Sequence, residues 1–240
     1  MLKRIAWSVA LVGLFCLTFH DARAQSEEKK FEIGGQFSLL RLISRTGTVA
    51  VLPCLGPLPC PTVTVFSEGR ETEPGFGGRI GYNFSKYVAA EAEGNFFPRD
   101  RDLDGGRKTQ GLFGVKAGKR FDKFGVFAKA RPGFVRFAKG DYQAVGGCIA
   151  IFPPPLACFA PIARTNFAFD LGGVVELYPT KRTIVRFDAG DTVIRAGSHN
   201  VVATQVPAPG SLAPIRFVVI PVSAETTHNF QGSIGFGFRF

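Results

Sequence analysis

After Gln25 the chain has no apolar run long enough for a membrane-spanning helix, which needs about 20 consecutive apolar residues. It also lacks a Pro- and Ser-rich linker that would divide it into two domains. Methionine and tryptophan occur once each, against 25 phenylalanines and 29 glycines. This composition is poor for helices and suits closely packed strands. We therefore expect one all-β domain.

Residues 1–24 have the layout of a cleaved secretory signal. Lys3 and Arg4 form a basic start, an apolar stretch covers 5–19, and the small-residue site Ala-Arg-Ala stands at 22–24. The apolar stretch is shorter than a spanning helix, which favours a cleaved signal over an anchor. We expect residues 1–24 to be removed on export and residues 25–240 to form the mature domain.

The net charge of the chain is basic. Signal removal would take away three of the 29 basic and one of the 19 acidic residues, leaving a net charge of about +8. A basic surface serves nucleic acid, anionic lipid or simple solubility. An exported chain has little use for nucleic acid, so anionic lipid is the partner class that we expect.

Apolar and polar residues alternate with a period of two along the whole mature sequence, which is typical of strands. The pattern is clearest near the C-terminus, where Phe230, Ile234 and Phe236 share one face. Each alternating segment is close to the roughly 9–11 residues that a tilted membrane-spanning strand needs. The eight segments are 31–43, 75–84, 87–97, 108–120, 124–137, 165–178, 183–195 and 227–240.

The connections between these segments alternate between short and long. Short turns follow the second, fourth and sixth segments, whereas the other four connections cover 44–74, 98–107, 138–164 and 196–226. Loops sorted in this way, with aromatic residues near both strand ends, are typical of membrane barrels. The two aromatic groups are Phe31, Tyr82, Phe84, Tyr87, Phe121, Phe124, Tyr178, Phe238 and Phe240 at one end, and Phe37, Phe96, Phe97, Phe134, Phe137, Phe167 and Phe230 at the other.

Together these features resemble the family of eight-stranded outer-membrane β-barrels, the small barrels of the OmpA, OmpX and OmpW type. The most specific motif is Gly-Phe-Gly-Phe-Arg-Phe at 235–240, because in this family a terminal Phe after alternating aromatics is read by the barrel assembly machinery. The resemblance implies an antiparallel up-and-down transmembrane barrel of a Gram-negative cell, with both mature termini in the periplasm. It also implies that Phe236, Phe238 and Phe240 are the assembly signal.

Strand alternation assigns charged residues to the interior of this barrel. If apolar positions face lipid, six acidic and six basic side chains point inward. Eight strands enclose a space that side chains just fill, so these charges should pair with one another. A narrow polar pore or proton path is the alternative. The predicted lumen charge network consists of Glu32, Arg79, Glu91, Glu93, Lys116, Lys129, Arg131, Asp170, Glu176, Arg186, Asp188 and Arg239.

Four cysteines remain after the signal, in two of the long loops. Outside the inner membrane, disulfides are the usual state of cysteine, and four cysteines allow three connectivities. We favour the pairs Cys54–Cys60 and Cys148–Cys158, because each pair lies within one Pro-rich loop. A zinc site is the alternative.

The chain offers little for catalysis. After the signal its only histidines are His199 and His228, and no acyl-transfer motif accompanies them. We therefore predict a non-enzymatic structural or surface-interaction protein, monomeric and without metal or cofactor. The alternatives are a narrow pore and, third, a lipid-A-modifying enzyme with His228 as its base. Basic residues near the long-loop ends suit lipopolysaccharide phosphates, and a generic solvated rim is the alternative. These residues are Arg41, Arg45, Arg70, Arg99, Arg101, Arg107, Lys108, Arg136, Lys139, Arg164, Arg195 and Arg216.

Overall fold

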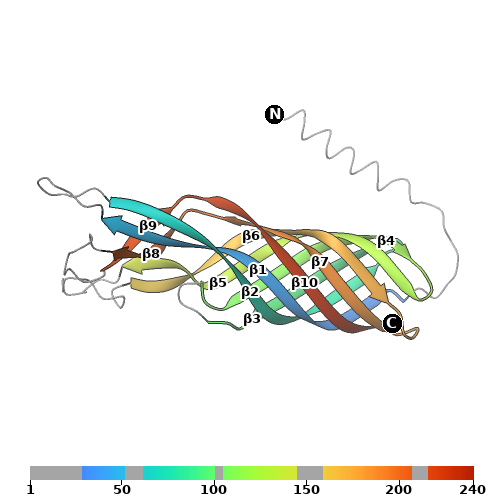
Figure 1. The fold of residues 1–240 in the computed structure, drawn as a ribbon. Coiled ribbons are helices and arrows are strands. Elements are labelled where there is room, and N and C mark those ends of the chain that lie inside the picture. The colour runs from blue at the N-terminus through green and yellow to red at the C-terminus, as the bar shows by residue number, and fades with distance from the viewer. Residues whose placement is uncertain (1–28, 52–61, 101–104, 145–158, 207–215) are drawn as a thin grey trace, which may run out of the picture.

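The computed structural model describes residues 29–51, 62–100, 105–144, 159–206 and 216–240, which form ten strands in one sheet (Figure 1). In these ranges there is no helix of the length and hydropathy that a membrane crossing requires. The strands are β1 (Phe31–Val51), β2 (Thr62–Asn83), β3 (Val88–Phe97), β4 (Lys108–Arg120), β5 (Phe124–Ala144), β6 (Phe159–Leu177), β7 (Thr183–Ala196), β8 (His199–Val206), β9 (Arg216–Val222) and β10 (Glu225–Arg239).

Eight of these strands close into a barrel. The sheet runs in the order β10-β7-β6-β5-β4-β3-β2-β1, and β10 pairs antiparallel with β1 from Arg239↔Glu32 to Phe230↔Arg41. Every strand of the ring therefore has a neighbour on both sides. The predicted eight-stranded antiparallel barrel is confirmed.

The side chains alternate between the two faces of the barrel wall, with charges inside and apolar groups outside. In β3, for example, Glu91 and Glu93 are buried while Ala92 between them is partly exposed. Large apolar side chains such as Phe76 (59% exposed) and Phe167 (56% exposed) cover the outer wall. This inversion of the soluble pattern is what a barrel in lipid requires.

One end of the barrel, which we call the short-turn end, contains three tight turns, the start of β1 and the end of β10. Backbone hydrogen bonds join Phe84 to Val88 (3.0 Å), Phe121 to Phe124 (2.7 Å) and Phe31 to Phe240 (3.0 Å) there. The opposite end is the long-loop end. The short turns fall where the sequence predicts them.

The long-loop end contains more strand than the sequence analysis predicts. β1 and β2 stay paired, without a break in register, as far as Val51↔Thr62. The segment expected as the last long loop contains the hairpin β8–β9, and β8 pairs in parallel with β1 at 48–50. The prediction limited strand length by membrane thickness, whereas the alternating valines and threonines of these segments continue to favour strand beyond it.

Candidate functional site

The barrel lumen is filled in three layers along its axis, which we name from the short-turn end. The charged layer comes first, the amide layer follows, and the apolar plug lies nearest the long-loop end. β1 shows this order in its inward residues Glu32, Gln36 and Leu40, all of which are buried. The charged layer contains eleven of the twelve predicted network residues, all buried, together with Arg120.

Lys116 lies at the centre of the charged layer. Its fully buried Nζ contacts Glu32 Oε2 at 2.9 Å and Glu91 Oε1 at 3.1 Å, and also pairs with Glu176. Oxygens of these three carboxylates lie within 4.8 Å of one another, the spacing of a metal site. The lysine ammonium supplies the positive charge that a metal ion would bring, so the cluster is complete without one.

Two arginines connect the remaining acids. Arg131 Nη2 lies 2.6 Å from Asp170 Oδ2, and its Nη1 pairs with Glu93. Arg186 pairs with Glu91, and its Nη2 lies 2.8 Å from Asp188 Oδ2. Because acids and bases share partners in this way, the charges of this layer other than Arg79 form one continuous network rather than a set of separate pairs.

Two predicted members stand apart from the network. Arg79 is only 5% exposed, yet in the described part of the chain no carboxylate lies within ion-pair distance of it, and its Nε has no hydrogen-bond partner. Arg239 is half-buried at the short-turn end, with its guanidinium 4.1 Å from the centre of the Tyr178 ring.

The sequence analysis missed Arg120 and placed Tyr178 with the outer aromatics. Arg120 Nη2 lies 2.9 Å from Glu32 Oε1, and its Nε donates to the Tyr178 hydroxyl at 3.0 Å. That hydroxyl in turn donates to Glu176 at 2.8 Å. Both residues have the inward parity of their strands, so the alternation pattern contained the signal.

The amide layer continues this hydrogen bonding without charge. Gln36 Nε2 donates to Asn95 Oδ1 (2.9 Å), and Asn95 Nδ2 donates to Gln110 Oε1 (2.8 Å). Gln110 and Gln231 exchange bonds of 2.8 and 3.0 Å. Asn95 also donates to Glu93 at 2.7 Å, which joins this layer to the charged layer.

The apolar plug follows the amide layer toward the long-loop end. Its members are packed together with little or no exposure, and Phe137 packs against them. Phe97 was grouped with the aromatic girdle at the long-loop end, but it is an inward residue with no exposed surface. Its parity matches that of Glu91 and Glu93, so the correction follows from the alternation itself. The plug consists of Leu40, Leu42, Phe97, Val135, Ala168 and Ile194.

One buried ion pair lies at the level of the plug, where Glu73 is opposite Leu40 and Lys108 is opposite Phe97. Several exposed cations lie near the long-loop end. Lys108 Nζ is 3.0 Å from Glu73 Oε1, and both side chains are about 1% exposed. Lys108 therefore points into the barrel, away from the lipopolysaccharide contact predicted for it. Exposed positions of the predicted set are Arg41, Arg70, Arg107, Arg136 and Arg195.

The second lysine of the predicted lipopolysaccharide set, Lys139, forms an ion pair within a loop cluster at this end. Its Nζ lies 3.0 Å from Asp100 Oδ1, and Arg107 Nε lies 3.6 Å from Asp100 Oδ2. The hydrogen bond from Lys139 holds the pKa of the Asp100 carboxyl below its ordinary value. The side chains of Arg45 and Arg216, residue Arg101, the signal segment and the four mature cysteines lie outside the described residues.

His228 lies on the outer wall of the barrel and has a partner that the sequence analysis missed. Its Nδ1 is 2.6 Å from Asp191 Oδ2, and the two side chains are 71% and 45% exposed. An Asp–His pair is two thirds of a hydrolytic triad. In the described ranges, however, His228 has no hydrogen bond to a serine, threonine or cysteine, so the geometry does not amount to a nucleophilic site.

The comparisons with known proteins agree with this architecture. The family model for the outer membrane protein beta-barrel domain matches residues 8–240. Among solved structures, the chain is similar to Neisserial surface protein A (14% identity, 88% of this chain and 97% of that one, TM-score 0.39). It is also similar to OprG from Pseudomonas aeruginosa (12% identity, 88% of this chain and 96% of that one, TM-score 0.42). A third is Ail, the attachment invasion locus protein of Yersinia pestis, in complex with the heparin analogue sucrose octasulfate (11%, 88% and 99%, TM-score 0.40).

These structural likenesses concern the fold alone, and no curated protein matches the chain in sequence. The family match spans nearly all of the residues, and the closed ring of eight strands with an apolar outer wall is the architecture that the match implies. The chain therefore belongs to the family of outer membrane protein beta-barrel domains and lies in the outer membrane.

Proposed function

We propose that this protein is a non-enzymatic surface protein, in which a closed barrel anchors a β-sheet platform that interacts with other molecules outside the cell. The observation that carries the proposal is the length of β1 and β2. They have 21 and 22 residues, about twice what a tilted spanning strand requires. Strand of this length outside the membrane serves a purpose other than anchoring.

The interior supports an anchor rather than a pore. A buried ion-pair network fills the lumen nearest the short turns, the amide layer follows, and the apolar plug lies nearest the long-loop end together with the Lys108–Glu73 pair. Eight strands leave little room beyond these side chains. A solute would have to displace all three layers to cross, so we propose that the lumen stays closed.

The platform is built from the outer halves of β1 and β2 together with β8 and β9. β9 ends the sheet, so within the described residues its second edge has no strand partner. A free edge presents backbone donors and acceptors to an extended polypeptide. The Asn200 N–H donates to Asp141 Oδ1 at 2.9 Å, which fastens β8 to β5 and holds the platform against the barrel.

The proposal also fixes the orientation and the partners of the barrel. We place the short-turn end in the periplasm of a Gram-negative cell, after export and signal cleavage, and the platform outside. The assembly machinery would read Phe236, Phe238 and Phe240, whose rings lie on the outer wall. Lipopolysaccharide phosphates would contact exposed arginines such as Arg41 and Arg195 by charge-assisted hydrogen bonds. We propose a monomer, since the barrel closes on itself.

Removal of the β8–β9 hairpin tests the platform. Ala196 and Glu225 face each other in the β7–β10 pair, so residues 197–224 can be replaced by an Asn-Gly turn. We expect the shortened barrel to remain heat-modifiable and in the outer membrane. We expect cells with the full chain to bind arrayed glycans or extracellular-matrix proteins, and cells with the shortened barrel to lose that binding.

The control is the turn at the opposite end, with Ser85-Lys86 replaced by Asn-Gly, which should leave binding unchanged. Equal binding by the full and shortened proteins would contradict the platform. So would an absence of binding combined with uptake of small solutes by the full protein, and that result would favour a pore.

A further inference from the structure

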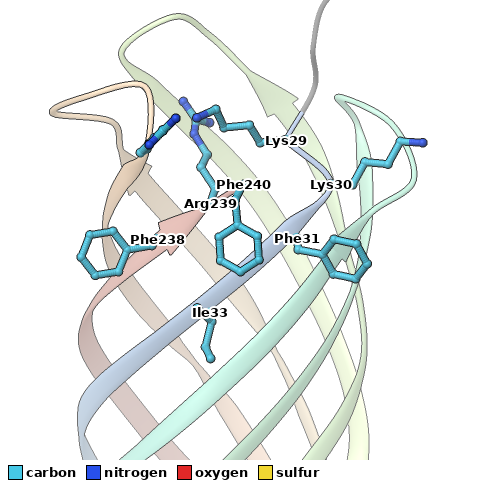
Figure 2. A pocket seen from close by; sticks show the side chains of 8 residues that line it. Lys29, Lys30, Phe31, Ile33, Phe238, Arg239 and Phe240 are labelled. Atoms are coloured by element: carbon cyan, nitrogen blue, oxygen red, sulfur yellow. The ribbon is translucent and has the colours of Figure 1, made fainter.

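An open pocket of about 900 Å³ lies at the short-turn end, where the first and last strands of the ring meet (Figure 2). One wall is apolar and belongs to the outer surface of the barrel. It consists of Phe31 and Ile33 from β1 with Phe238 and Phe240 from the end of the chain, and each side chain is 50–63% exposed. This wall faces the hydrocarbon region of the membrane.

The apolar wall is held in place by the closing seam. Phe31 and Phe240 exchange two backbone hydrogen bonds of 3.0 Å, and their rings stack with centroids 6.5 Å apart. Phe238 is fixed in turn by an edge-to-face contact with Phe236, at 5.2 Å between centroids. The wall is therefore a preformed surface rather than a set of independent side chains.

The other lining residues are all cations. Lys29, Lys30 and Arg239 stand at the rim above the phenylalanine rings (Figure 2), and Arg182 is the fourth cation of the lining. Arg239 is oriented by its stack on Tyr178 and by a 3.1 Å hydrogen bond from Nε to the Lys181 carbonyl. Among the residues that the structure describes, no acidic side chain lines the pocket. Glu32, which stands between the lining residues Phe31 and Ile33 in sequence, points into the lumen and is bound there by Lys116 and Arg120.

We propose that this pocket binds an anionic glycerophospholipid of the leaflet at the short-turn end. Lysine and arginine are suited to the headgroup phosphate, and the phenylalanine wall is suited to the first carbons of the acyl chains. Four cations directly above a lipid-facing apolar wall match an amphipathic anion, whereas a free phosphate would gain nothing from the wall. The assignment to the periplasmic leaflet rests on the proposed orientation, but the binding itself does not.

The test uses the full protein in non-ionic detergent and native mass spectrometry with phosphatidylglycerol or phosphatidylcholine. The pocket variant is Lys30→Gln with Arg182→Gln. The matched control, Lys86→Gln with Lys123→Gln, removes two exposed cations from other turns at the same end. Loss of two interfacial cations should lower phosphatidylglycerol retention roughly tenfold in the pocket variant, and far less in the control.

Phosphatidylcholine should be retained weakly by all three proteins, and excess inorganic phosphate should not displace phosphatidylglycerol. Equal losses in both variants, or no preference for phosphatidylglycerol, would overturn the proposal. Because both lipids are supplied in detergent, these outcomes do not depend on orientation. Labelling of Lys123→Cys on intact cells with an impermeant maleimide tests the orientation separately.

Discussion

The half of the lumen near the short turns is filled by ion pairs, whereas the half near the long loops is filled mainly by apolar side chains. In the first half, the stability of the fold depends on intact ion pairs, because a buried charge is costly once its partner is removed. In the second half, each side chain of the apolar plug contributes through the area that it buries and needs no specific partner, whereas Lys108 and Glu73 beside the plug form one buried ion pair. The contrast teaches that the two halves should respond differently to the loss of one side chain.

The largest effect should come from Arg186→Ala. Arg186 is about 1% exposed and pairs with Glu91 and Asp188, so its removal leaves buried acids short of a partner. We expect a loss of about 3–5 kcal/mol in the free energy of unfolding, measured by urea titration in lipid vesicles. Arg70→Ala, which removes an exposed arginine, is the control, and an equal loss there would show that the network adds nothing.

Leu40→Ala tests the plug. Leu40 is completely buried among the other plug residues, and its truncation should leave a cavity that costs about 3 kcal/mol. Unlike Arg186→Ala, this change strands no charge, so its cost should depend little on salt. Leu39→Ala, on the exposed outer face of the same strand, is the matched control. A Leu40 variant as stable as this control would mean that the plug is loosely packed.

The smallest effect should come from Arg79→Met. Arg79 is buried but lacks an ion-pair partner among the described residues, and the carboxylates of the charged layer attract it only from a longer distance. Replacing it therefore removes a buried charge that no ion pair holds and keeps most of the volume. We expect the free energy of unfolding to change by no more than about 1 kcal/mol, and to rise rather than fall. A loss as large as that of Arg186→Ala would contradict the distinction between paired and unpaired charge, and the same urea titration decides it.

Much of this interior could be predicted because strand alternation leaves no freedom: a shift by one residue would move every side chain to the other face. Glu91, Glu93 and Arg131 were therefore placed inside from parity alone. Phe97 and Tyr178 were misplaced because aromatic character was given more weight than parity. The partners of each ion pair, such as Lys116 with Glu32, depend on closure of the ring. A single strand carries no information about that.

The long-loop end was harder to predict for a different reason. Membrane thickness sets a lower limit on strand length but no upper limit. It could therefore not predict that β1 continues beyond Ile43 or that β2 begins well before Gly75. The β8–β9 hairpin depends on pairing with β1 at 48–50, a contact between segments about 150 residues apart.

Single-channel recording of the unmutated protein in planar bilayers tests the closed lumen most directly. The charged layer, the amide layer and the apolar plug together fill the barrel, so we predict no stable conductance of the size seen with open porins. The double variant Leu40→Ala with Phe97→Ala, which thins the plug, should show small conductance steps under the same conditions. A large, stable conductance in the unmutated protein would contradict the closed lumen and establish a pore.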